Sequence, residues 1–147
     1  MTDAGQSAHF TKHVRAAPED AAQIRREFSS WLRAHFTLDP TRASDVVLAV
    51  NEALANAAEF AYVNSAAPGL MHLRADYDGD AEVLTVTVSD EGMWRIAETD
   101  HKNPARGRGI PLMRALTDRA VIDSNHAGTA VRLQWDNIDQ NCGSRTT

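Results

Sequence analysis

A glutamate and an asparagine four residues apart are the first residues in this sequence whose types and spacing suggest chemistry. Glu52 and Asn56 lie in an alanine-rich stretch that favours a helix, where residues four apart share one face. A carboxylate can accept a proton from water or a hydroxyl group. An amide oxygen can bind Mg²⁺, because hard cations prefer oxygen ligands. Glu59 follows on the same predicted face, and a solvated polar surface is the alternative interpretation.

An aspartate followed closely by a glycine forms the second candidate. Asp90 comes directly after an alternating stretch that predicts a strand, and Gly92 lies two residues further on. A carboxylate here could accept a hydrogen bond from the exocyclic amine of adenine, whereas guanine presents a carbonyl at that position. Gly92 would let the backbone come close to the base. An ordinary turn is the alternative, because Asp and Gly are common turn residues.

A run of alternating arginine and glycine precedes a short predicted helix. The run consists of Arg106, Gly107, Arg108 and Gly109. Free backbone N–H groups at a helix N-terminus suit a polyphosphate, and the two arginines could add charge-assisted contacts. The spacing differs from that of a P-loop, because no Gly-Lys-Ser/Thr follows. A flexible loop is the alternative interpretation.

Gly128 and Thr129 form the last candidate patch, at the start of the final predicted strand. The threonine hydroxyl could orient Asp90, or a water molecule, at the edge of an adenine ring. The alternative interpretation is that the glycine is an ordinary residue of a hairpin turn. In chain order, the four patches supply groups for a divalent metal, an adenine and a phosphate chain.

Hydrophobic periodicity predicts the elements that must hold these residues. Pro18 and the Asp39-Pro40 pair are typical of helix starts. The sequence predicts, in order, an edge strand at 9–16, helices at 18–35 and 40–62, strands at 70–77 and 82–89, a loop at 90–108, a helix at 110–118 and strands at 119–124 and 129–135. The loop is longer than most loops in compact domains, which favours a functional role.

Length, charge and cysteine content narrow the class of protein. A chain of 147 residues suits one domain, so we expect disorder at 1–8, a single domain at 9–136 and a flexible tail at 137–147. The net charge of −5 argues against direct nucleic-acid binding. Cys142 is the only cysteine, which excludes an internal disulfide. No apolar run approaches the roughly 20 residues of a membrane helix, so we expect no membrane partner and a cytoplasmic protein.

The order and spacing of the four patches resemble the GHKL ATPase superfamily. They match its N box and three G boxes over roughly residues 41–135. The stretches 90–95 and 106–113 are similar to those of actinobacterial anti-sigma factor serine/threonine kinases. The resemblance implies that residues 9–136 form a GHKL-like ATP-binding domain with the Bergerat fold. This fold is an α+β two-layer sandwich, with a mixed, mainly antiparallel sheet and helices on one face.

The resemblance also implies roles for the candidate residues. Glu52 would be the catalytic base and Asn56 the Mg²⁺ ligand, while Asp90 would read adenine. The implied cofactors are ATP and Mg²⁺, and the residues that would bind them are Asn56, Asp90, Gly92, Arg106, Gly107, Arg108, Gly109 and Thr129. The glycines of the arginine–glycine run would flank the phosphates in a mobile lid.

Two positions depart from the family's pattern. Trp94 stands where a second glycine is usual after Asp-x-Gly, and Glu59 stands where a histidine often follows the asparagine. Trp94 would narrow the pocket. A second acid near the metal would either tighten Mg²⁺ binding or repel the phosphates. ATP binding is therefore implied more directly than phosphotransfer.

The function implied by the resemblance is partner switching by an anti-sigma factor. Such a protein sequesters a sigma factor and uses ATP to phosphorylate a serine or threonine of an anti-anti-sigma (STAS-type) protein, and a homodimer is a further expected partner. A catalytically weak nucleotide-binding interaction module is one alternative. The ATP-binding domain of a histidine kinase is another, although no helix with a phospho-accepting histidine is expected ahead of the domain.

Overall fold

The computed structural model describes residues 5–60, 69–91, 111–125 and 128–140. Its elements, in chain order, are β1 (Gly5–Arg15), α1 (Pro18–His35), β2 (Phe36–Thr37), α2 (Pro40–Phe60), β3 (Leu70–Gly79), β4 (Val83–Asp90), β5 (Arg119–Asn125), β6 (Gly128–Trp135) and β7 (Asp139–Gln140). Residues 111–116 form a further short helix. Each helix and strand predicted from the sequence is therefore confirmed, with boundaries that differ by a few residues.

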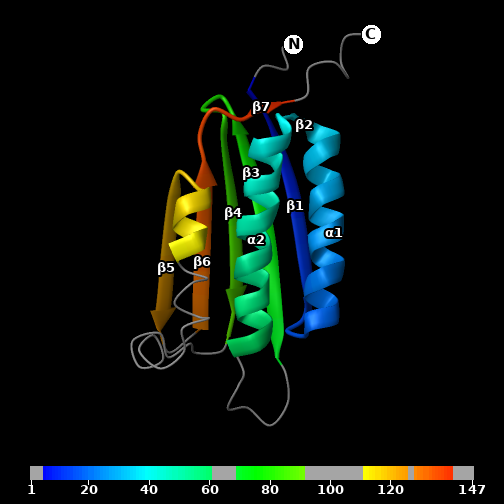
Figure 1. Cartoon of the computed structure of the whole chain (residues 1–147), viewed down its shortest axis with the longest axis vertical. Helices are drawn as coiled ribbons and strands as arrows, with labels where there is room; N and C mark the ends of the chain where they lie inside the picture. Colours follow the sequence, from blue (N-terminus) through cyan, green and yellow to red (C-terminus); the bar gives the residue numbers. More distant parts are fainter. Residues whose placement is uncertain (1–4, 61–68, 92–110, 126–127, 141–147) are drawn as a thin grey trace.

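Five strands form one sheet in the order β1-β3-β4-β6-β5, and β2 pairs with β7 in a separate two-stranded sheet. Helices α1 and α2 lie side by side across one face of the larger sheet (Figure 1). All pairings between the described strands are antiparallel. The predicted α+β sandwich with helices on one face is confirmed, and β1 is an edge strand as predicted.

The two long helices begin where the sequence predicts. Pro18 lies in the first turn of α1, where a missing N–H is tolerated. Asp39 caps α2, because its Oδ1 accepts a hydrogen bond of 2.7 Å from the backbone N–H of Arg42. A cap of this kind typically contributes about 1 kcal/mol. It fixes the start of α2, and with it the direction in which Glu52 and Asn56 point.

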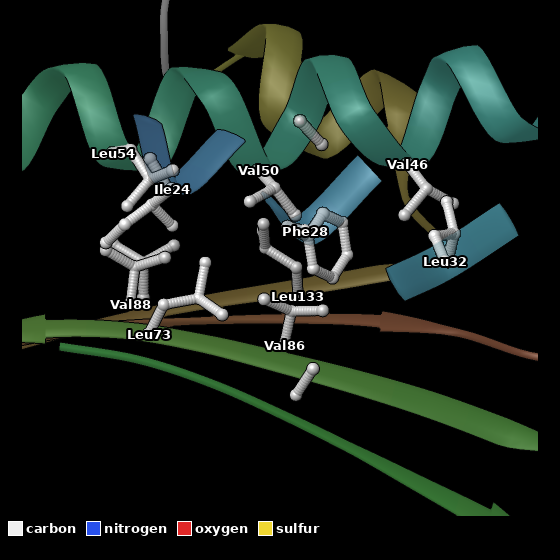
Figure 2. Close-up of a cluster of buried hydrophobic side chains, with 14 of the residues drawn as sticks. Ile24, Phe28, Leu32, Val46, Val50, Leu54, Leu73, Val86, Val88 and Leu133 are labelled. Carbon is white, nitrogen blue, oxygen red and sulfur yellow. The ribbon is translucent and has the colours of Figure 1, made fainter. Parts of the chain in front are cut away.

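A single apolar core lies between the helices and the sheet (Figure 2). Its fully buried members include Ile24, Phe28, Val50, Leu54, Leu73, Val86 and Leu133. Strand β4 shows the predicted alternation, with Leu84, Val86 and Val88 all turned into the core. Burial of each such side chain contributes about 1.5–3 kcal/mol. This packing holds α2 against β4 and fixes the positions of the polar residues of α2 over the sheet.

An ion pair joins the edge strand to the helical layer. Lys12 on β1 lies 3.0 Å from a carboxylate oxygen of Glu27 on α1. The amide of Gln23 donates a further hydrogen bond of 2.8 Å to the same carboxylate. These bonds from Gln23 and then Lys12 lower the pKa of Glu27. The contact is exposed to solvent, so it orients β1 more than it stabilises the fold.

Two regions that were expected to be irregular contain strands. β1 begins at Gly5, which pairs with Gly79, so the prediction of disorder is wrong for residues 5–8. β7 lies inside the expected tail and pairs with β2. Ile138 is fully buried beside it, and its carbonyl accepts a hydrogen bond of 2.6 Å from the Tyr77 hydroxyl. One apolar residue among polar neighbours leaves no periodic signal in the sequence, although it is sufficient to anchor this segment.

The sequence predicts that the short helix at 111–116 turns Leu112, Met113 and Leu116 inward, and only two of the three are inward in the structure. Met113 is buried and Leu116 packs against the core, whereas Leu112 is 37% exposed rather than inward. At about 100° per residue, Leu116 lies between Leu112 and Met113 around the helix axis, so Leu112 is at the edge of the apolar face. The pair spaced three apart is the one that packs.

The sheet face opposite the helices is polar. His13 on β1 and His72 on β3 are direct partners, and their Nδ1 atoms lie 2.6 Å apart. His72 also contacts Glu91 through Nε2 at 2.8 Å. The sequence presents these histidines as scattered, and only the strand register brings the two together. Among the described residues, no group of three or more metal-ligating side chains is assembled.

Candidate functional site

Three buried polar side chains lie at one end of the fold. Asn56, Asp90 and Thr129 are 6%, 5% and 2% exposed, and they are the buried polar residues of the described core. They come from the C-terminal half of α2, the end of β4 and the start of β6. These segments lie at the same end of the molecule, at the bottom of Figure 1. Burial of polar groups is unfavourable unless partners satisfy them, so their concentration at one end marks a candidate site.

Strand register fixes the relation between Asp90 and Thr129. Asp90 is the last residue of β4, and it pairs with Thr129 on one side and with the buried Met71 on the other. The Thr129 hydroxyl lies 3.0 Å from the hydroxyl of Ser124 on β5. A carboxylate, a threonine methyl and a thioether thus lie next to each other across three strands. A flat base with a polar edge fits such a mixture of polar and apolar groups.

Gly128 allows the approach of β6 to the end of β4. Its φ is +143°, in the region that disfavours residues with a Cβ. A Cβ built on Gly128 would lie 2.0 Å from the carbonyl oxygen of Asp90 and 2.8 Å from the Cα of Glu91. Both contacts are with backbone, so neither can be relieved by a side-chain rotation. Glycine is therefore needed here to position Thr129 beside Asp90.

Asn56 carries the clearest sign of a missing partner. Its Nδ2 is buried and has no hydrogen-bond partner, and it is the one such side-chain atom in the described part of the chain. A buried donor left unpaired typically costs about 1–3 kcal/mol. Rotation of the amide exchanges its nitrogen and oxygen, so the same side chain can offer a donor or an acceptor to a ligand. The residue fits a site whose polar partners arrive with the ligand.

Glu52 lies one helical turn before Asn56 on α2. Its side chain is half-buried, and it has no hydrogen-bond or ion-pair partner within the ranges described. Glu59, which follows Asn56, is exposed. The structure therefore brings a free carboxylate and an unpaired amide together on one helix.

The other predicted site residues lie outside the described residues. They are Gly92, Arg106, Gly107, Arg108 and Gly109, together with Trp94 and the rest of the predicted loop after residue 91. Their roles remain predictions from the sequence.

Two residues next to the site were missed by the sequence reasoning. Ser124 pairs with Thr129 across the last hairpin and bonds its hydroxyl. Counting outward from the predicted turn at 125–128 would have placed the two opposite each other. Met71 neighbours Asp90 through the β3–β4 pairing, and the register of that hairpin would have indicated it.

The chain belongs to the histidine kinase-like ATPase domain family, whose model matches residues 14–135. This confirms the resemblance to GHKL ATPases that the motifs suggested. The match spans α1, α2 and strands β3 to β6 of the larger sheet, with only the last two residues of β1, and it includes Glu52, Asn56, Asp90 and Thr129. ATP binding is the activity of this domain class.

A solved structure shares the fold. It is described as the crystal structure of the RsbU and RsbW domains of Rv1364c from Mycobacterium tuberculosis. The sequence identity is 24% and the TM-score is 0.65, over 88% of this chain and 33% of that chain. This chain therefore spans a third of that longer one, and the likeness shows the fold. Within the ranges that the structure describes, no helix is both long enough and apolar enough to cross a membrane.

Proposed function

We propose that this chain is an ATP-binding anti-sigma factor with protein serine/threonine kinase activity. The observation that carries the proposal is the buried, unpaired amide of Asn56 at the same end of the fold as buried Asp90. Membership of the histidine kinase-like ATPase family supports the binding of ATP. The motif resemblance described above, together with the fold shared with a structure containing an RsbW domain, supports the anti-sigma kinase branch.

In this proposal, each end of the nucleotide meets a different element. Asp90 accepts a hydrogen bond from the adenine amine, and Thr129 orients that edge from the neighbouring strand. Gly92 would let the backbone come close to the base. Asn56 offers its amide oxygen to Mg²⁺, which neutralises phosphate charge when bound. The phosphates meet the arginine–glycine run, Arg106 to Gly109.

Glu52 is the proposed general base. A serine or threonine hydroxyl of the partner attacks the γ-phosphorus, and the bond from that phosphorus to the β–γ bridging oxygen breaks. The hydroxyl proton passes to the Glu52 carboxylate, and ADP leaves. A half-buried carboxylate without a partner in the described structure is available for this transfer.

The proposed partners are a sigma factor and a STAS-type anti-anti-sigma protein, which compete for the chain in the cytoplasm. Phosphorylation adds about −1.5 to −2 charge to the acceptor. The chain has a net charge of −5, and Glu52 lies at the site. Charge repulsion would therefore release the phosphorylated acceptor and free the chain to bind the sigma factor.

A phosphotransfer assay with ATP and a candidate STAS-type acceptor tests the proposal. We expect Glu52→Ala to slow transfer by roughly 10²–10⁴-fold while ADP affinity changes little. Asp80→Ala is the control, because Asp80 is an exposed acid in the β3–β4 turn, at the opposite end of these strands from Asp90, and this variant should transfer at close to the wild-type rate.

Three results would revise the proposal. Transfer by Glu52→Ala at the wild-type rate would remove Glu52 as the base. Nucleotide binding without transfer to any STAS-type acceptor would indicate a binding module. An acid-labile product would indicate phosphohistidine instead of phosphoserine, and with it a histidine kinase domain.

A further inference from the structure

A groove runs between α1 and α2, on the outer side of the helical layer. Its volume is about 740 Å³. It is lined from α1 by Arg25, Ser29, Leu32 and Arg33, from the connection by Phe36, Thr37 and Leu38, and from α2 by Pro40, Ala43, Ser44, Val47, Leu48 and Asn51. The groove lies between the C-terminal part of α1 and the N-terminal half of α2, and the two helices lie side by side in Figure 1.

The lining residues form two parallel stripes. On each helix they recur at steps of three and four, which places them along one face. The stripe on α1 runs from Arg25 to Arg33, about 12 Å at 1.5 Å per residue, and the stripe on α2 runs from Pro40 to Asn51, about 16 Å. This length matches about three turns of a third helix laid into the groove.

The middle of the groove is lined by short side chains and by apolar ones. Ser29, Ala43 and Ser44 have short side chains, which allow another backbone to come close. Leu48 is 43% exposed, and Val47 beside it is half-buried. An exposed leucine alone is ordinary. An exposed leucine beside a half-buried valine in a concave surface forms an apolar patch, and such patches are typical of protein-binding surfaces.

The groove is positive on an acidic chain. Arg25 has no hydrogen-bond or ion-pair partner in the described part of the chain, and Arg33 donates to the Ser29 hydroxyl at 3.0 Å. No carboxylate is among the lining residues, although the chain carries a net charge of −5. In a two-fold dimer formed groove to groove, both copies would bring their arginines to the same interface. The charge therefore favours an acidic partner over self-association.

We propose that this groove binds a three-turn amphipathic helix of an acidic partner protein. The apolar face of that helix packs on Val47 and Leu48, and two of its carboxylates pair with Arg25 and Arg33. The arginines are eight residues apart on α1, about 12 Å along the axis, so the partner's acids are spaced by two turns.

This docking surface is separate from the nucleotide site. At about 100° per residue, Asn51 in the groove and Asn56 in the core point about 140° apart on α2. The proposal goes beyond the kinase function and does not depend on ATP. Binding of the partner helix should therefore persist in an Asn56→Ala variant. A failure of the groove proposal can thus be distinguished from a failure of the proposed nucleotide site.

The test uses two stapled, fluorescent helical peptides of about 14 residues, long enough to fill the groove. Both carry leucines three and four residues apart, with glutamates two turns apart in one and lysines at the same places in the other. Fluorescence anisotropy with the full chain should give a Kd of about 10–100 µM for the glutamate peptide. The lysine peptide should bind at least about 10-fold more weakly.

Variants of exposed or half-buried groove residues complete the experiment. The double variant Arg25→Glu/Arg33→Glu should reverse the preference between the two peptides, and Leu48→Asp should weaken both. Arg26→Glu is the matched control, because Arg26 is exposed on α1 and lies outside the groove lining. It should bind like the wild type.

Each opposing outcome would overturn the proposal. Equal affinity for the two peptides, or no binding up to roughly 1 mM, would exclude an acidic helix. An equal effect of Arg26→Glu and Arg25→Glu would show that only overall charge matters. A wild-type dimer that Leu48→Asp converts to a monomer in sedimentation would identify the occupant as a second copy of this chain.

Discussion

Asp90 and Thr129 are direct partners in the pairing of β4 with β6, and both side chains are buried at the end of the sheet. The pairing holds a carboxylate and a hydroxyl at fixed relative positions before any ligand arrives. Ser124 further restrains Thr129 through the contact between their hydroxyls. A binding site preorganised in this way loses less conformational entropy when a ligand is bound.

Replacement of Asp90 by asparagine tests the proposed adenine contact. The amide is a weaker acceptor and can present a donor where adenine also donates. Loss of a hydrogen bond to a charged group typically costs about 1.5–3 kcal/mol, so ADP affinity should fall roughly 10- to 150-fold. Preference for ATP over GTP should shrink as well. Calorimetric titration measures both, with Asp123→Asn on β5 as an exposed control. Unchanged affinity in a folded Asp90→Asn protein would remove Asp90 from the site.

A pair of substitutions separates a structural from a binding role for the Thr129 hydroxyl. Thr129→Val and Ser124→Ala both remove the contact between the two hydroxyls, so each should lower the free energy of unfolding by about 0.5–1.5 kcal/mol. Only Thr129→Val also removes the group next to Asp90, so it should weaken ADP binding more. Equal ADP affinities of the two variants would limit Thr129 to a structural role.

Gly128→Ala should be strongly destabilising. The new Cβ would meet the Asp90 carbonyl oxygen, and φ at this position is positive. Strands β4 and β6 would have to separate, and we expect a loss of about 2–4 kcal/mol in the free energy of unfolding. Urea denaturation measures this loss, with Ala130→Ser two positions along β6 as the control. A loss below that of the control would contradict the close approach described above.

The sequence predicted the fold well because its signals were local. The Asp39-Pro40 start of α2 and the alternation of Leu84, Val86 and Val88 report caps and faces that depend on near neighbours. The positions of Glu52, Asn56, Asp90 and Thr129 on their elements followed from those boundaries. Family resemblance, rather than periodicity, supplied their proposed roles.

Features that depend on distant segments were not predictable from the sequence. The need for Gly128 arises from the end of β4, and the contact between His13 and His72 arises from strand register. The groove between the helices exists only once α1 and α2 lie side by side. Ile138 anchors β7 through Tyr77, which is far away in the chain.

Replacement of Asn56 by alanine is expected to have opposite effects on stability and on nucleotide binding. Asn56→Ala removes a buried amide whose Nδ2 is unpaired. The free energy of unfolding of the ligand-free protein should therefore stay the same or rise by up to about 1 kcal/mol, rather than fall as buried substitutions usually do. Asn51→Ala on the same helix corrects for the gain in helix propensity, which is typically below about 0.7 kcal/mol.

The decisive measurement is the calorimetric titration of ATP with Mg²⁺ into Asn56→Ala and the wild type. The account predicts at least about a 10-fold loss of affinity in a variant that is as stable as the wild type, since one lost polar contact to a charged ligand corresponds to about 1.5 kcal/mol or more. Wild-type affinity in Asn56→Ala would contradict it, and so would a loss of binding that merely accompanies unfolding.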